Sequence, residues 1–177
     1  MVYGGGVRKP QKVVFFNAIL IDVKYENIID DYLNSIFGSP KIVSEKFSFS
    51  HTSYYEKEMG NNLVKYFACY DIIDYPDKLV NYKRIAVDIE DFFKENGKRK
   101  VNIDPGYVAM EKVVAASTKN FTHRIYLGES IYADLQLYRK KKSYVALPWT
   151  FYDYQTSNAL IFFEKCRIFL EEKLNAN

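Results

Sequence analysis

The sequence predicts a single α+β domain built around a mainly antiparallel sheet, with a first part ordered as in ferredoxin-like folds. Three observations predict this class: the order of strand and helix patterns up to residue 103, a series of short alternating runs after residue 106, and a closing amphipathic segment. A chain of 177 residues is long enough to bury one core. We expect a flexible, glycine-rich tail over residues 1–11 and one domain over residues 12–177.

The first part alternates between two kinds of hydrophobic pattern. β-branched and aromatic runs indicate strands, whereas apolar residues spaced three and four apart indicate helices. Gly38 and Pro40 end the first helical pattern, and Gly97 ends the second. The predicted order is strand 12–21, helix 25–37, strand 41–50, strand 62–73, helix 76–95 and strand 98–103. This β-α-β-β-α-β order is the split unit of ferredoxin-like folds, and we expect both helices on one face of the sheet.

The remainder of the chain is predicted to form β-hairpins and a C-terminal helix. In the string NIDPGY, Pro105 followed by Gly106 predicts a tight turn directly after the fourth strand. Short apolar or alternating runs then follow at residues 112–117, 123–128, 130–140 and 143–149. Residues 154–174 carry apolar side chains at helical spacing, which predicts an amphipathic helix.

Composition limits the class of protein. The formal net charge of +3 is too small to indicate a nucleic-acid partner by itself. No apolar stretch approaches the roughly 18 residues of a membrane helix, and the first ten residues are too polar for a signal sequence. We therefore expect a cytoplasmic protein with no membrane partner. Cys69 and Cys166 each lie in an apolar run, which predicts buried free thiols.

The first of three polar clusters lies between the second and third predicted strands. It spans residues 49–60, whereas a hairpin needs only about 2–5 residues. Its candidate acid/base or metal-binding groups are His51, Glu56 and Glu58, with Tyr54 and Tyr55 as ligand contacts. The alternative is a short exposed helix whose carboxylates are simply solvated.

The second cluster has two polar corners on either side of an apolar run. Its candidate residues are Asn102, Asp104 and Tyr107 at the predicted turn, and Ser117, Lys119, His123, Arg124 and Tyr126 in and after the next loop. Hydroxyl, ammonium, imidazole and guanidinium donors suit a phosphate or a carboxylate. The alternatives are a structural Asx-turn at Asp104 and a solvated hairpin corner.

The third cluster precedes the C-terminal helix. Trp149, the only tryptophan, can form the wall of a pocket for a planar ring, and Asp153 follows it closely. Asp153 or Thr150 is alternatively a helix N-cap, and for Asp153 the sequence favours capping over a ligand contact.

Several catalytic and nucleotide-binding motifs are missing. The chain has no P-loop string, no G-x-G-x-x-G, no G-x-S-x-G and no H-E-x-x-H. Because it has only two histidines, a divalent metal would have to be held mainly by carboxylates, and the sequence leaves the cofactor open.

Four strings, SHTSYYEKEMG, VNIDPGY, STKNFTHRIYLG and LPWTFYDYQT, occur in this order in the chain. Together they resemble domain-of-unknown-function family 4416, a prokaryotic family of small single-domain proteins, nearly from end to end. The resemblance implies that the clusters belong to one site, and it implies no reaction. The matching positions are His51, Thr52, Tyr54, Tyr55, Glu56, Glu58, Met59, Gly60, Asn102, Asp104, Pro105, Gly106, Tyr107, Ser117, Lys119, His123, Arg124, Tyr126, Trp149, Thr150, Asp153 and Tyr154.

Two functions of different kinds fit these residues. The favoured one is the binding of a small anionic ligand, phosphorylated or nucleotide-like, in one cavity lined by all three clusters, with His51 and His123 both in its wall. Acid/base roles would then fall to His51, Glu56, Glu58, Asp104 and His123. The alternative is an RNA-binding or protein-interaction module that uses an aromatic sheet face and the basic run 138–142.

Overall fold

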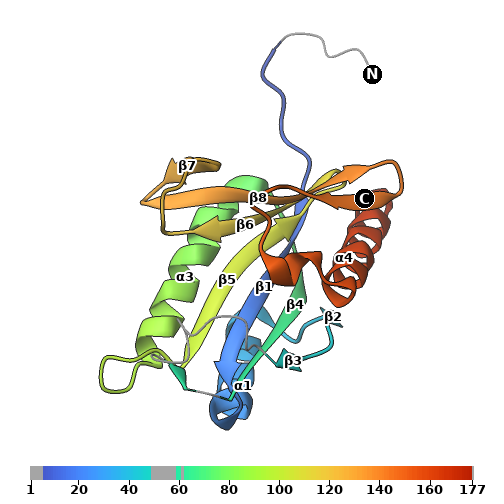
Figure 1. Cartoon of the computed structure of the whole chain (residues 1–177). Coiled ribbons are helices and arrows are strands. Elements are labelled where there is room, and N and C mark those ends of the chain that lie inside the picture. Colours follow the sequence, from blue (N-terminus) through green and yellow to red (C-terminus); the bar gives the residue numbers. More distant parts are fainter. Residues whose placement is uncertain (1–5, 49–58, 61, 177) are drawn as a thin grey trace.

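The computed structural model describes residues 6–48, 59–60 and 62–176. Within these residues, nine strands form one antiparallel sheet, and three α-helices pack on it (Figure 1). The strands are β1 (Val13–Asp22), β2 (Ile42–Val43), β3 (Phe47–Ser48), β4 (Leu63–Asp74), β5 (Val101–Val108), β6 (Lys112–Ser117), β7 (Arg124–Gly128), β8 (Ile131–Lys140) and β9 (Ser143–Ala146). The helices are α1 (Glu26–Phe37), α3 (Leu79–Phe92) and α4 (Ser157–Asn175). The predicted single α+β domain with a mainly antiparallel sheet is confirmed.

The strand order is β2-β4-β1-β5-β6-β8-β7, with β3 also paired to β4 and β9 to β8. The predicted strand over residues 41–50 is replaced by the two short strands β2 and β3, both on β4. The hairpin strands and the two predicted helices lie close to where the sequence places them. The ferredoxin-like description of the first part stays a prediction.

The helices divide between the two faces of the sheet. Ile19 and Ile21 of β1 pack on one face with Ile29 and Leu33 of α1 and with Ala86 of α3. The intervening side chains of β1 point to the other face, as the two-residue period of a strand requires. There Phe16 and Ala18 pack against α4 through its own apolar side chains, among them Phe162, Phe163 and Cys166. Both faces in the middle of the sheet are therefore covered.

The string NIDPGY lies inside β5, so the predicted turn at Pro105 and Gly106 is wrong. Pro105 lies opposite Asn17 of β1, and the pairing of β5 with β6 begins only at the next residue, Gly106. A proline is tolerated in a strand where no neighbouring strand needs its missing N–H. Position 106 requires a glycine because its neighbours lie too close for a side chain, not because the chain turns there. An added Cβ would lie 2.5 Å from the carbonyl oxygen of Val114 and closer still to the Phe16 ring.

The start of α4 also differs from the prediction. Thr156 caps this helix by accepting a hydrogen bond from the backbone N–H of Ala159. Asp153, predicted as the cap, lies earlier, in a short 3-10 helix over Tyr152–Gln155, and is buried. Thr150, Asp153 and Thr156 are all of residue types that cap helices, and only the local backbone decides between them.

Cys69 and Cys166 are buried free thiols, as predicted. Among the described residues, no helix is both long and apolar enough to cross a membrane.

Candidate functional site

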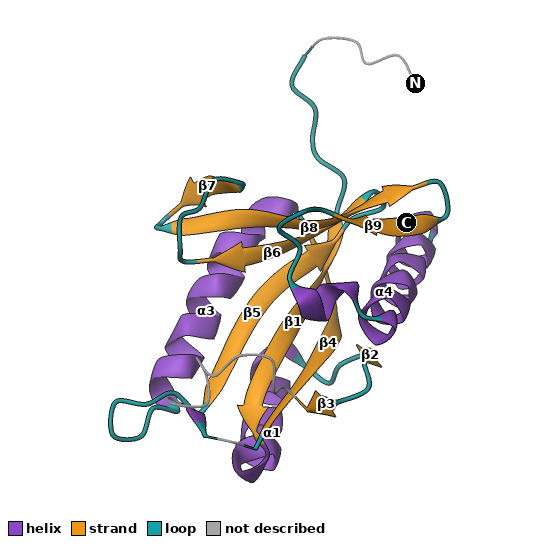
Figure 2. Cartoon of the chain, viewed as in Figure 1, coloured by secondary structure: helices purple, strands orange, loops and turns teal. Residues whose placement is uncertain are grey.

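The candidate site is a cavity that opens where β6 leaves β5. The two strands pair only over Gly106–Val108 and Val113–Ala115. In the same register Asp104 would face Ser117, but there the strands have already separated, as Figure 2 shows. A cavity of about 250 Å³ fills the gap, lined by Lys83, Val87, Glu90, Arg99, Asn102, Asp104, Ala116, Ser117, Thr118, Lys119, Arg124 and Phe151.

Two charged side chains of α3 bond to the strand edge that β6 leaves open. Glu90 Oε1 accepts a hydrogen bond of 2.7 Å from the backbone N–H of Ile103, and Lys83 Nζ donates one of 2.7 Å to the carbonyl oxygen of the same residue. Lys83 and Glu90 thus supply the donor and the acceptor that a neighbouring strand would supply. Their side chains are only 5% and 9% exposed, respectively, so these bonds are shielded from competing water.

A chain of polar contacts runs along β5 beneath the cavity. Lys83 Nζ lies 3.0 Å from Asp104 Oδ1, and Asn102 Nδ2 donates to Asp104 Oδ2 at 2.9 Å. Arg99 donates in turn to Asn102 Oδ1 at 2.8 Å and lies 3.6 Å from Glu90 Oε2. Asp104 is the most open of the charged groups on this side, with 28% of its side chain exposed.

The opposite wall is formed by the end of β6, the loop after it and the start of β7. Arg124 Nε donates to Asp134 Oδ2 at 2.7 Å, and its NH1 donates to the carbonyl oxygen of Lys119 at 2.9 Å. Asp134 is fully buried and also accepts a 2.7 Å bond from Gln136 Nε2. Ser117 Oγ accepts from the backbone N–H of Lys119. The guanidinium of Arg124 is therefore fixed in position by a carboxylate behind it.

The two carboxylates that line the cavity respond differently to their surroundings. Burial by itself would raise the pKa of Asp104, but Lys83 and Lys65 outweigh it, and the net effect lowers the pKa. For Glu90 burial dominates over the nearby Lys83 and Arg99, so its pKa is raised. Asp104 is accordingly ionised at neutral pH, whereas Glu90 takes up a proton more readily than an ordinary glutamate does.

His123 and Trp149 lie next to this wall but do not line the cavity. Their rings stack with centroids 4.9 Å apart and an interplanar angle of 11°. Trp149 Nε1 donates to the carbonyl oxygen of Leu135, and His123 Nε2 lies 3.3 Å from Asp134 Oδ1. Asp134 thus connects the stacked pair to Arg124.

The remaining predicted site residues are dispersed. Tyr107 packs against Phe15 in the core on the α3 side of the sheet, where burial raises its pKa to about 12. Tyr126 is exposed on the edge strand β7. Asp153 forms a buried ion pair of 2.5 Å with Lys65. The first cluster, with His51, Tyr54, Tyr55, Glu56 and Glu58, lies outside the described residues.

Of the predicted residues, the structure brings together at the cavity Asn102, Asp104, Ser117, Lys119 and Arg124. Sequence reasoning missed Lys83, Glu90, Arg99 and Asp134. A signal for two of them was present: Lys83 and Glu90 lie seven residues apart, and Leu79 and Ala86 continue the same buried stripe of α3. Residues at this spacing share one helix face, so two charges within an apolar stripe indicate buried polar contacts.

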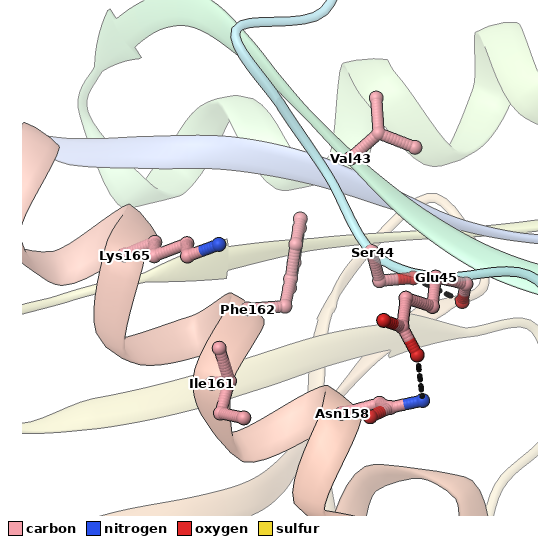
Figure 3. Close-up of a pocket in the computed structure, with 7 residues that line it drawn as sticks. All are labelled: Val43, Ser44, Glu45, Asn158, Ile161, Phe162 and Lys165. Atoms are coloured by element: carbon pink, nitrogen blue, oxygen red, sulfur yellow. Dashed lines mark hydrogen bonds between the residues drawn. The ribbon is translucent and has the colours of Figure 1, made fainter.

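A smaller hollow of about 110 Å³ lies between α4 and the edge of the sheet (Figure 3). It is bordered by Val43, Glu45, Asn158, Ile161 and Lys165, and its one drawn contact between the two sides is the bond from Asn158 Nδ2 to Glu45 Oε2 at 3.1 Å. None of the predicted site residues lies there. In the part of the chain that the structure describes, no group of three or more His, Cys, Asp and Glu side chains is placed to hold a metal ion.

The fold and the cavity define a class: a single-domain α+β protein whose antiparallel sheet is opened between two neighbouring strands around a polar cavity. The family described as a domain of unknown function (DUF4416) matches residues 11–169, and the chain belongs to this family. No curated protein and no solved structure matches the chain.

Proposed function

We propose that this protein binds a small anionic ligand, phosphorylated or nucleotide-like, in the cavity between β5 and β6. The observation that carries the proposal is the position of Arg124, which is held on buried Asp134 and borders the cavity beside Ser117, Thr118 and Lys119. Among the described residues, the NH2 nitrogen of Arg124 has no hydrogen-bond partner, so it retains donors for a ligand.

The charge of the lining supports an anion. Four cationic side chains (Lys83, Arg99, Lys119 and Arg124) and two carboxylates (Glu90 and Asp104) border the cavity, and with the buried carboxylate of Asp134 behind Arg124 one cation remains in excess. A guanidinium has a planar fork of donors that matches phosphate and carboxylate oxygens, and an orientation fixed in advance lowers the entropic cost of binding. The excess of positive charge and the fixed orientation of the Arg124 guanidinium favour phosphate over a neutral ligand.

Proton transfer, if this site performs it, falls to Glu90. Its raised pKa and its place in the cavity wall are the features of a general acid or base. His123, a candidate for this role in the sequence, borders Asp134 rather than the cavity.

The RNA-binding alternative is less well supported. Modules that bind single-stranded RNA on a sheet expose aromatic side chains on the face opposite their helices. Here α4 covers that face, and Phe16 and Phe67 beneath it are 1% and 0% exposed. The basic run 138–142 lies at the end of β8 and in the turn to β9.

The test is thermal unfolding with inorganic phosphate, sulfate and a nucleoside monophosphate. A ligand at 100 times its Kd stabilises the native state by about 2.7 kcal/mol, which for a chain of this size is a Tm increase of roughly 5–11 °C. The emission of Trp149 gives a second readout, because its stacking partner His123 adjoins the carboxylate that holds Arg124.

Two variants and a control locate the binding. Lys119→Ala removes an exposed cation from the wall, and Arg124→Lys keeps the charge but removes the fork. Both are expected to reduce the phosphate-induced Tm shift, whereas Lys142→Ala, which removes a cation from the β8–β9 turn, should retain it. An equal shift in all three variants would place the anion elsewhere.

A further inference from the structure

The two walls of the cavity differ in charge, and the difference bears on the chemistry of the ligand. The wall formed by Ser117, Thr118, Lys119 and Arg124 has hydroxyls and cations but no lining carboxylate. The opposite wall, from α3 and β5, pairs two cations, Lys83 and Arg99, with the carboxylates of Glu90 and Asp104. A ligand that spans the cavity therefore meets a cationic wall on one side and a wall of balanced charge on the other.

With respect to the residues that the structure describes, the wall of balanced charge retains unused hydrogen-bonding capacity. Each carboxylate oxygen has about two lone-pair positions, and Asp104 uses one on each oxygen, for Lys83 and for Asn102. The amide nitrogen of Asn102 has two N–H donors, of which the bond to Asp104 uses one. A half-buried carboxylate that lines the cavity next to an amide suits hydroxyl groups, which both donate and accept.

We propose that the ligand is a phosphate ester of a polyhydroxylated molecule, a sugar phosphate, with its phosphate on Arg124 and Lys119 and neighbouring hydroxyls on Asp104 and Asn102. This inference rests on the proposed function. The first proposal assigns the anionic group of the ligand, and this one adds a hydroxylated group that contacts the opposite wall.

One further observation favours hydroxyls at this wall over a positively charged group, and two others bear on the strength of the contact and on the size of the ligand. Lys83 and Arg99 already neutralise Asp104 and Glu90, so no net negative charge remains to attract an ammonium group. Asp104 also stays ionised because Lys83 and Lys65 lower its pKa, and hydrogen bonds to an ionised acceptor are stronger than those to a neutral one.

The size of the cavity limits the size of the ligand. Its volume of about 250 Å³ lies below the roughly 300–1,000 Å³ of common ligand pockets, which favours a single phosphorylated sugar over a dinucleotide.

The experiment compares four probes on the wild-type protein by titration calorimetry: inorganic phosphate, butyl phosphate, ribose 5-phosphate and ribose. Ribose 5-phosphate is expected to bind at least about tenfold more tightly than butyl phosphate, as one or two bonds to a charged acceptor would give. Ribose alone should bind too weakly to measure. If phosphate and butyl phosphate bind as tightly as ribose 5-phosphate, the sugar assignment is overturned and the anion site stands; if none of the phosphates binds, both proposals fail.

Asp104→Asn then assigns the hydroxyl contact. This near-isosteric change keeps an acceptor for Lys83 but removes the charge, so the preference for ribose 5-phosphate over butyl phosphate should disappear while inorganic phosphate binds as well or better. The matched control is Asp71→Asn, which makes the same change at an exposed carboxylate of β4 paired with Lys173. A variant that retains the sugar preference, or that loses inorganic phosphate as strongly as ribose 5-phosphate, contradicts the role given to Asp104.

Discussion

Lys83 and Asp104 form an ion pair, 3.0 Å between Nζ and Oδ1, that passes around the open edge of β5. Ile103 packs on the face that α1 and α3 cover, so the adjacent Asp104 points to the opposite face. A side chain from α3 can reach it only because β6 has left β5 at this point. The same separation of strands thus makes the cavity and admits the lysine that stabilises its edge.

Replacement of Lys83 by methionine should destabilise the fold. The variant loses the bond to the carbonyl oxygen of Ile103 and leaves Asp104 and Glu90 without their shared cation. A cost of about 1–3 kcal/mol in the free energy of unfolding is expected, measured by urea denaturation. The control on the same helix is Arg84→Ala, which breaks an exposed pair with Glu129 and should cost less than about 1 kcal/mol. Equal costs for both variants would contradict the structural role of Lys83.

Glu90 should make stability depend on pH. Because its folded pKa is raised above the ordinary value of 4.5, the native state holds a proton that the unfolded state has already released. Stability from this group therefore falls as pH rises from 4.5 towards the folded pKa. Urea denaturation across this window should show the wild type losing more free energy of unfolding than Glu90→Gln, in which the titrating proton is absent. Parallel curves would show that the fold does not raise this pKa.

Gly106→Ala should be strongly destabilising although the position is in a strand. The added Cβ meets the carbonyl oxygen of Val114 and the ring of Phe16, and overpacking of this kind typically costs about 1–3 kcal/mol. The double variant with Phe16→Leu should recover part of the loss, because only the contact with the ring is relieved. A fully additive double-mutant cycle would mean that Phe16 is not what excludes the side chain.

The two thiols should be inert in the folded protein. Cys69 and Cys166 are both 0% exposed, and burial raises the pKa of Cys166 well above its usual value. A thiol reagent such as Ellman's should react with neither until the chain unfolds. Ser35→Cys, at an exposed position of α1, supplies the control that should react at once. Immediate reaction of the wild type would show that the core around α4 opens readily.

Periodicity predicted most of the architecture. Apolar runs with a period of two, and stripes three and four apart, place the strands of the hairpins and the helix α1 close to their observed bounds. The error at Pro105 and Gly106 arose because proline and glycine usually mark a turn. Here the proline lies where a neighbouring strand is absent, and the glycine makes room for Phe16, both of which depend on tertiary contacts.

The candidate site was only partly accessible to the same reasoning. Polar residues at strand ends identified Asp104, Asn102 and Arg124, but the partners that fix them come from elements distant in the chain. Asp134 occupies a polar position in the alternating run 130–140, and nothing in its sequence neighbours indicates that Arg124 bonds to it. Lys83 and Glu90 had a signal in their helical spacing, whereas the gap that they fill is a property of the sheet.

The short junction between β5 and β6 has a consequence for cooperativity. The nine strands form one sheet, yet among the described residues strand pairing joins the β2-β4-β1-β5 part to the β6–β9 part only where Gly106–Val108 pair with Val113–Ala115. The first part lies between helices on both faces, whereas β7 is an exposed edge strand. Native-state hydrogen exchange should therefore reveal two units, with the amides of β7 and β9 opening at lower free energy than those of β1 and β4. The cavity would then lie at the boundary between a slowly and a rapidly exchanging half of a single sheet.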